Sequence, residues 1–308
     1  MTGEEGAAAA AAAASSSTST ATTPPPDAKI NAADGRFYWQ GVDADVNGML
    51  GGFPYISKVD LQGSRNFLAK LGVGTKSGLR TVSRALEGGA GNSARAGRAN
   101  VLPRLTHCSV PCILSSLYLV SSGNLSPVPP YIRPLSLSPP TQGSEPCRAP
   151  ADPQPFPSIG RITEGLLLDV AEQVDIVEPI AKFTAALQEK SGVGSVFNIG
   201  LEEWKPLDGT SYDLVWNQWC LGHLTDDQLV AYLRRCKEVV APTDGFIVVK
   251  ENLSTNGADL FDDVDSSVTR VDEKFRLLFE QAGLRLIKTE LQRGFPKELF
   301  PVRMYALK

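Results

Sequence analysis

The sequence predicts an α/β fold with a mostly parallel β-sheet, helices on both faces and an antiparallel strand at the C-terminal end. From residue 85 onward, short apolar runs typical of buried strands alternate with helical patterns. A glycine-rich turn follows the first strand, and a second strand ends in an acidic residue, as in a nucleotide-binding βαβ unit. The last two strands, residues 284–291 and 302–308, are too close in sequence for a crossover helix. We therefore expect them to pair as an antiparallel hairpin.

The N-terminal part divides into two segments. Residues 1–29 consist of alanine, serine, threonine and proline runs that bury too little side-chain surface to offset the entropy of ordering. They are predicted to be a disordered, low-complexity tail. Residues 30–91 should form a short helical extension, then the first strand and its glycine turn. Four apolar residues recur at helical spacing in this extension, namely Leu61, Phe67, Leu68 and Leu71.

The glycine turn, with Gly89 and Gly91, lacks the helix that should follow it directly. Residues 92–158 are instead rich in proline and serine and have no sustained periodicity of 2 or 3.6. They are predicted to be a disordered insert. Proline, serine, leucine and phenylalanine codons are rich in pyrimidines, so we hypothesise that this segment is translated intron.

The missing helix begins after the insert, and residues 159–308 complete the domain. One helical face carries the apolar residues Ile162, Leu166, Leu167 and Val170. The strand at residues 174–177 then ends at Glu178, which lies about 20 residues beyond the glycines once the insert is removed. An acid in this position is typical of a ribose-binding residue.

The remaining elements continue the alternation. Further strands are predicted at residues 195–200, 212–219 and 246–252. Thr225 and Gln228 form a capping-box pattern that opens a helix, and a second helix over residues 272–282 should end at Gly283. A parallel sheet that finishes with an antiparallel strand is more typical of methyltransferases than of dinucleotide dehydrogenases.

Composition restricts the partners and the compartment. The formal net charge of -4 and the pI near 5.4 disfavour direct nucleic-acid binding and favour a basic peptide. No apolar run is long enough to span a membrane, so no membrane partner is expected. The five cysteines form no paired CxxC framework, which indicates a reducing compartment and no metal site. We expect a cytoplasmic protein, with the nucleus as a second location.

Several motifs resemble those of the α-N-terminal protein methyltransferases, which are class I S-adenosylmethionine-dependent enzymes with a Rossmann-like sheet. The motifs are YWQ at 38–40, GMLGG at 48–52, IGRIT at 159–163, WNQWCLGHLTD at 216–226, RRCK at 234–237, KEN at 250–252 and DDVDSSVTR at 262–270. The resemblance covers residues 37–89 and 159–308. It implies that S-adenosylmethionine donates one to three methyl groups to the α-amino group of proteins that begin with Xaa-Pro-Lys. A monomer is the favoured assembly.

The resemblance also implies a set of site residues. The cofactor would contact Gly89, Arg161, Glu178, Leu201, Glu202 and Gln218. The substrate channel would include Trp39, Leu50, Gly51, Trp219, Asp262 and Ser267. Catalysis would involve Asp265, His223 and Asn252. Either Asp265 or His223 can take the proton of the substrate amine, and the side-chain carbonyl of Asn252 can orient that amine.

The sequence departs from the family pattern at a few positions. Glu87 and Glu178 stand where aspartate is usual, Glu202 stands where an amide is usual, and Phe300 replaces a channel tyrosine. The acid exchanges keep the charge, whereas Phe300 removes one hydroxyl from the channel.

Other interpretations remain open on the sequence alone. His223 can be a structural histidine, and Trp39 and Trp219 can be core aromatic residues. The insert in the cofactor loop favours, as the alternative function, a catalytically weak or inactive methyltransferase-like protein that only binds peptides. A nucleic-acid amino-methyltransferase would need an Asn-Pro-Pro-aromatic turn, but residues 217–220 read NQWC. A small-molecule methyltransferase stays open as well, although the acidic channel favours a cationic peptide as the substrate.

Overall fold

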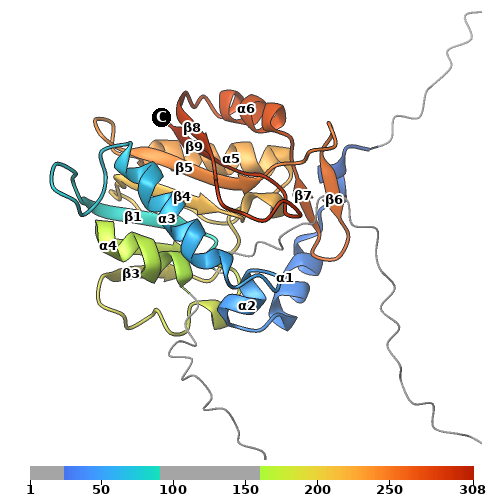
Figure 1. Ribbon diagram of the computed structural model, residues 1–308, viewed down its shortest axis with the longest axis horizontal. Coiled ribbons are helices and arrows are strands. Elements are labelled where there is room, and N and C mark those ends of the chain that lie inside the picture. Colours follow the sequence, from blue (N-terminus) through green and yellow to red (C-terminus); the bar gives the residue numbers. More distant parts are fainter. Residues whose placement is uncertain (1–23, 91–159) are drawn as a thin grey trace, which may run out of the picture. The chain divides into compact units, whose positions relative to one another are not determined.

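The computed structural model describes residues 24–90 and 160–308, which form a seven-stranded sheet with helices on both faces (Figure 1). The strand order is β3-β2-β1-β4-β5-β9-β8. The strands are β1 Val82–Gly88, β2 Ala171–Val177, β3 Val193–Phe197, β4 Leu214–Gln218, β5 Phe246–Asn252, β8 Leu286–Leu291 and β9 Val302–Leu307. Strands β1 to β5 are parallel, and β9 runs antiparallel to both β5 and β8. The predicted fold class and C-terminal hairpin are therefore confirmed.

Successive residues along the central strands point to opposite faces and bury two separate cores. On one face, Val248 packs in a cluster with Phe67 of α3 (Ile56–Ala69) and Leu166 of the helical segment after the glycine turn. On the other face, Val249 packs with Leu233 of α5 (Asp226–Val239) and Phe275 of α6 (Asp272–Gln281). Helices therefore cover both faces, as predicted.

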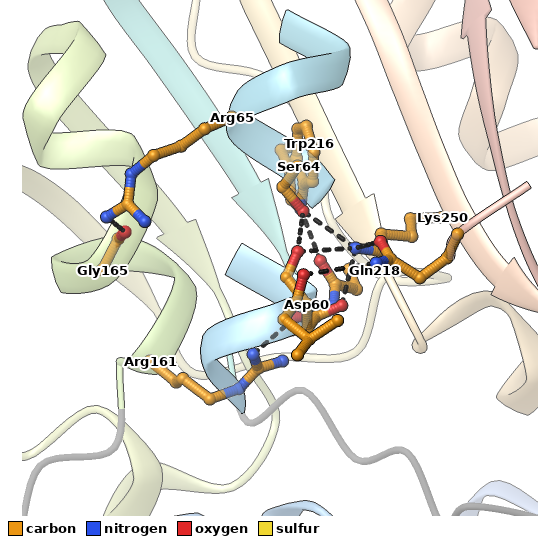
Figure 2. Close-up of polar contacts among 10 residues, drawn as sticks. Asp60, Ser64, Arg65, Arg161, Gly165, Trp216, Gln218 and Lys250 are labelled. Carbon is orange, nitrogen blue, oxygen red and sulfur yellow. Dashed lines mark hydrogen bonds and ion pairs between the residues drawn. The ribbon is translucent and has the colours of Figure 1, made fainter. Parts of the chain in front are cut away.

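The helical segment after the glycine turn has an irregular backbone. Residues Thr163–Leu167 (η2) are π-helical and continue into α4, Leu168–Val170. The side chain of Arg65 on α3 donates a hydrogen bond to the backbone carbonyl of Gly165 within this segment (Figure 2). Such single-turn π-helices are frequent at functional sites.

The N-terminal extension consists of η1 (Pro26–Lys29), α1 (Ala32–Gly41), α2 (Val46–Met49) and α3. The side chain of Asn31 caps α1 by accepting a hydrogen bond from the backbone N–H of Ala33 at 2.9 Å. Because η1 is helical, the predicted tail boundary at residue 29 lies too far along the chain. The rest of that tail, Gly91 and the predicted insert at 92–158 lie outside the described residues.

Two local predictions are confirmed at helix ends, and one element was missed. The capping box of Thr225 and Gln228 opens α5. Gly283 follows α6 with a φ of 71°, a left-handed conformation that suits glycine. The missed element is the antiparallel hairpin of β6 (Leu260–Asp262) and β7 (Ser267–Thr269), whose strands are too short to show an alternating pattern. Within the described ranges, every helix is too short or too polar to cross a lipid bilayer.

Candidate active site

The candidate site lies at the carboxyl ends of β1, β2 and β4. The strand order reverses between β1 and β4, and ligands of open α/β sheets bind at such a switch point. A cavity that is partly open to solvent occurs there. Its wall includes Gly89 after β1, Glu178 after β2 and Cys220 after β4, while Gly35 and Trp39 of α1 line another part of it.

Four predicted cofactor residues line this cavity, namely Gly89, Glu178, Leu201 and Glu202. Gly89 has a φ of 74°, and a Cβ atom at this position would lie 2.4 Å from the Cβ of Cys220. Only glycine therefore allows this close approach of the turn to the β4 end. Glu178 is buried and accepts a hydrogen bond from the backbone N–H of Ile180 at 2.8 Å.

The other two predicted cofactor residues, Arg161 and Gln218, belong to an adjacent buried cluster and are not part of the cavity wall. Figure 2 shows both side chains pointing toward Asp60. Arg161 reaches Asp60 from the side opposite to Lys250. The Asp60 Oδ2 atom accepts from Arg161 Nη1 at 2.5 Å and from Gln218 Nε2 at 3.0 Å. The Lys250 Nζ atom lies 2.6 Å from Asp60 Oδ1. We call these four residues the Asp60 cluster.

Burial and charge act against each other within the Asp60 cluster. Burial alone would raise the pKa of Asp60, but the charges of Lys250 and Arg161 outweigh it, so the pKa lies below its usual value. Burial lowers the pKa of Lys250, and the carboxylate of Asp60 opposes this effect. Asp60 is therefore an ionised carboxylate held by two cations.

Arg161 keeps two hydrogen-bond donors for a further partner. Its Nε and Nη2 atoms are buried and have no hydrogen-bond partner within residues 24–90 and 160–308. Its guanidinium also lies 5.4 Å from the ring centre of Trp219. Buried donors without partners are costly, and the guanidinium fork matches a carboxylate in geometry and charge. This part of the site is therefore suited to a carboxylate ligand.

Trp39 and His223, which are 184 positions apart in the sequence, contact each other at the cavity wall. The indole Nε1 of Trp39 donates to His223 Nε2 at 3.2 Å, and the two rings are nearly perpendicular. His223 also hydrogen-bonds to the backbone of Ser266. Burial lowers the pKa of His223 below its usual value, although the nearby charge of Asp265 opposes this effect. The ring is thus held neutral, with Nε2 acting as an acceptor.

The loop between β6 and β7 places Asp265 next to His223 and α1. Asp265 is almost fully buried, and its Oδ1 atom accepts from the Ser267 hydroxyl at 2.6 Å. The next residue, Ser266, has a φ of 55°, and its hydroxyl oxygen accepts from the backbone N–H of Asn31 at 2.8 Å. A Cβ atom on Gly35 of α1 would lie 3.1 Å from the Asp265 carbonyl oxygen. Helix α1 is therefore packed tightly against this loop.

Trp219 connects the Asp60 cluster to the predicted substrate channel. It packs with Leu50 in a small apolar cluster, and Gly51 follows Leu50 with a φ of 57°. Trp219 itself has a φ of 53°. Trp219 and Ser266 are the two non-glycine residues with positive φ in the described chain, and strained backbone of this kind concentrates at functional sites.

The remaining predicted residues lie near the site but do not line the cavity. Asn252 is the last residue of β5 and pairs with Val302 of β9. Asp262 ends β6 and is half-buried, as is Phe300 just before β9. The structure thus brings Asp265, His223 and Trp39 together. Asp262, on the β6–β7 hairpin, is close enough for its charge to act on His223, and Asn252 lies at the carboxyl end of β5.

Sequence reasoning missed several residues that shape the site. Asp60 and Lys250 belong to the Asp60 cluster but were not predicted as site residues, although Lys250 lies in the KEN motif at 250–252. Buried Glu251 accepts hydrogen bonds from the backbone N–H groups of Cys220 and Leu221, both at 2.9 Å, and so holds the turn after β4. Burial raises the pKa of Glu251 to about 7, although these hydrogen bonds oppose the shift.

Arg36 was also missed, and it accounts for one departure from the family pattern. Its Nη2 atom lies 2.7 Å from Glu202 and 2.5 Å from Glu203, so the acid at position 202 has a cationic partner on α1. An amide at position 202 could not form this ion pair. Position 36 falls within the predicted helical extension, where nothing in the sequence relates it to residue 202.

Comparisons with known proteins show which family this chain is similar to. The family model described as AdoMet dependent proline di-methyltransferase matches residues 27–107 and 156–308. Alpha N-terminal protein methyltransferase 1 of Schizosaccharomyces pombe is 50% identical over 151 residues, which are 48% of this chain and 68% of that protein. Its Arabidopsis thaliana namesake is 35% identical over 89% of this chain and 78% of its own length.

Two further matches extend over nearly the whole chain. N-terminal Xaa-Pro-Lys N-methyltransferase 1 of Xenopus tropicalis is 32% identical over 88% of this chain and 92% of its own length. Among solved structures, a SAM-dependent methyltransferase from Leishmania major aligns with a TM-score of 0.61 and 29% identity. That alignment covers 90% of this chain and 82% of the Leishmania chain.

Proposed function

This chain belongs to the family of AdoMet-dependent proline di-methyltransferases, and we propose that its cavity and the adjacent Asp60 cluster together bind the cofactor and the substrate N-terminus. The protein is an S-adenosylmethionine-dependent methyltransferase of the α-amino group of proteins that begin with Xaa-Pro-Lys. The alternative of an inactive peptide-binding protein has no comparable support. Mono-, di- and trimethylation are all within the proposed activity.

The observation that carries the proposed cofactor site is the pair of buried Arg161 donors without partners. They fit the carboxylate of the cofactor's methionine moiety. Glu178 is suited to the ribose hydroxyls, and Gly89 allows close approach of the backbone. Leu201 and Glu202 would contact the adenine. When bound, the cofactor supplies a methyl group on a positively charged sulfur, which an amine lone pair can attack.

The aromatic residues suit the second-position proline of the substrate and a methylated amine. Trp39 lies at the cavity, and Trp219 lies over Arg161 and against Leu50. Flat aromatic walls of this kind attract a cationic amine by about 0.5 to 2 kcal/mol, which would keep a partly methylated N-terminus in place. We assign the acidic Asp262 to the lysine at the third position of the substrate, with Gly51 and Ser267 completing the channel.

We assign proton uptake from the substrate amine to Asp265 rather than to His223. The α-amino group has an unperturbed pKa of about 8, so a base has only to complete its deprotonation. The Nε2 acceptor of His223 already binds the indole N–H of Trp39, so His223 would have to release Trp39 before it could act. In this assignment His223 positions Trp39, and Asn252 orients the amine through its side-chain carbonyl.

Mass spectrometry of synthetic peptides tests the proposed function. An Xaa-Pro-Lys peptide incubated with the protein and S-adenosylmethionine should gain methyl groups on its α-amine. A peptide with an acetylated N-terminus should gain none, and one with glutamine for the third-position lysine should react more slowly. Methylation of the lysine side chain would refute the proposed chemistry.

The location and assembly are proposals with separate support. We propose a cytoplasmic and nuclear monomer that does not bind nucleic acid directly, in keeping with a net charge of -4 and the cysteine pattern. Fluorescence microscopy of the tagged chain tests the location, and light scattering tests the assembly. Exclusive staining of a secretory compartment, or a stable dimer at micromolar concentration, would contradict them.

A further inference from the structure

The Asp60 cluster joins the N-terminal extension to the carboxyl ends of two central strands. Asp60 belongs to α3, Gln218 is the last residue of β4 and Lys250 belongs to β5. The side chains of Asp60 and Lys250 are fully buried, and that of Arg161 is 5% exposed. Figure 2 shows Arg161 approaching the cluster from the lower side of α3, away from the strands. Two cations and one carboxylate are thus enclosed together.

Asp60 is fixed on several sides, so its carboxylate has little freedom to turn. Lys250 holds Oδ1, and Gln218 donates to both carboxylate oxygens, at 3.2 and 3.0 Å. Gln218 is itself held by the indole N–H of Trp216, which donates to its side-chain oxygen at 3.2 Å. Lys250 also donates to the Ser64 hydroxyl at 2.9 Å. The direction in which Asp60 contacts Arg161 is therefore set by β4 and β5.

This contact decides which edge of the Arg161 guanidinium remains for a ligand. A guanidinium can bind a carboxylate in paired fashion through its two terminal nitrogens or through Nε and one terminal nitrogen. Asp60 occupies Nη1, which prevents the first arrangement. The Nε and Nη2 atoms form the other edge, and these are the two buried donors that lack a partner among the described residues.

We propose that Asp60 is a positioning residue that turns the Nε–Nη2 edge of Arg161 toward the carboxylate of the bound cofactor. The proposal rests on the proposed cofactor site. Lys250 and Gln218 support this role by keeping Asp60 from swinging onto Nη2, where it would compete with the ligand. A purely structural ion pair would give no reason for two buried donors to stay unsatisfied beside it. Helix α3 thereby contributes to cofactor recognition without contacting the cofactor.

Calorimetric titration with two ligands tests this role. S-adenosylhomocysteine carries the amino-acid carboxylate, whereas 5′-methylthioadenosine has the same nucleoside and thioether without it. Asp60→Asn keeps the size of the side chain and removes its charge. We expect this substitution to weaken S-adenosylhomocysteine binding by about tenfold and to leave 5′-methylthioadenosine binding unchanged. A tenfold change corresponds to the lower end of the free energies that hydrogen bonds to charged groups contribute.

A matched control is available in β2. Asp175 is also a buried carboxylate paired with an arginine, at 2.6 Å from Arg84, but it does not line the cavity. Asp175→Asn should leave the affinity for both ligands unchanged. Equal weakening of both ligands by Asp60→Asn would overturn the proposal, because it would indicate a general disturbance of the fold.

Arg161→Met separates failure of this proposal from failure of the proposed cofactor site. If Arg161→Met binds S-adenosylhomocysteine as the wild type does, the proposed carboxylate site is wrong. If Arg161→Met loses affinity for this ligand alone while Asp60→Asn does not, the positioning role is wrong. In the double variant of both substitutions, the loss should not exceed that of Arg161→Met alone, because both act on one interaction.

One further variant guards against poor folding of Asp60→Asn, which leaves two buried cations without a carboxylate. Asp60→Asn combined with Lys250→Met removes one charge of each sign. It should show the same selective loss of S-adenosylhomocysteine affinity. Wild-type affinity in this folded double variant would overturn the proposal.

Discussion

Replacing Glu251 by glutamine should change how the stability of the protein depends on pH. Glu251 is buried behind the turn that carries Trp219 and accepts two backbone hydrogen bonds from that turn. A glutamine oxygen can accept the same two bonds, so the exchange mainly removes the ability to ionise. The comparison therefore isolates the cost of a buried charge at the active site.

The magnitude follows from the pKa of Glu251, which burial raises from 4.5 to about 7. The pKa of Glu251 is higher in the folded protein than in the unfolded chain. The contribution of Glu251 to the stability of the fold is therefore complete below about pH 4.5 and is lost as the pH rises through about 7. At about 1.4 kcal/mol per pH unit, the full difference is on the order of 3 kcal/mol, of which about 2.5 kcal/mol falls between pH 5 and pH 8.

Urea unfolding of the wild type and of Glu251→Gln, at intervals from pH 5 to pH 8, measures this difference. The free energy of unfolding of the wild type should fall by about 2.5 kcal/mol relative to the variant as the pH rises. Glu172→Gln, an exchange at an exposed position of β2, should show no such trend. The reasoning would be refuted if the difference in unfolding free energy between the wild type and Glu251→Gln did not change with pH. It would also be refuted if the wild type became more stable relative to the variant as the pH rises.

Three further substitutions test the site itself. Asp265→Asn should lower kcat for an Xaa-Pro-Lys peptide by about 100-fold or more, because it removes the proposed base. The KM for S-adenosylmethionine should change little. A near-normal kcat in steady-state kinetics would exclude Asp265 as the base. Gly89→Ala should weaken cofactor binding by at least about tenfold in calorimetry, because alanine disfavours a φ of 74° and its Cβ atom would lie 2.4 Å from Cys220; unchanged affinity would contradict the close approach. Trp39→Phe should keep the aromatic wall and release His223 Nε2, so the pKa of His223 measured by NMR should shift, whereas an unshifted value would show that the indole N–H is not its partner in solution.

The sheet and its helices could be predicted because their signals are local. The capping box of Thr225 and Gln228, Gly283 after α6 and the closely spaced final strands are each readable within a few residues. The β6–β7 hairpin has strands of three residues, which are too short for a periodic pattern. The sequence of that region, DDVDSSVTR at 262–270, therefore shows a group of acidic residues and no strand pattern.

The Asp60 cluster could not be predicted because its members are distant in sequence. Asp60 and Lys250 are 190 positions apart, and nothing near either residue indicates that a buried partner exists. The same holds for Trp39 and His223, which are 184 positions apart. Trp39 and His223 were predicted as site residues from the family motifs. Their mutual contact could not be predicted, because it depends on how α1 packs over the sheet.

The most direct test of the account is a crystal structure of the chain with S-adenosylhomocysteine and an Xaa-Pro-Lys peptide. The ligand carboxylate should contact Nε and Nη2 of Arg161, and the ribose should contact Glu178. The α-amine of the peptide should lie within hydrogen-bond distance of Asp265. A ligand bound elsewhere, or a peptide whose α-amine points away from both the ligand sulfur and Asp265, would contradict the account.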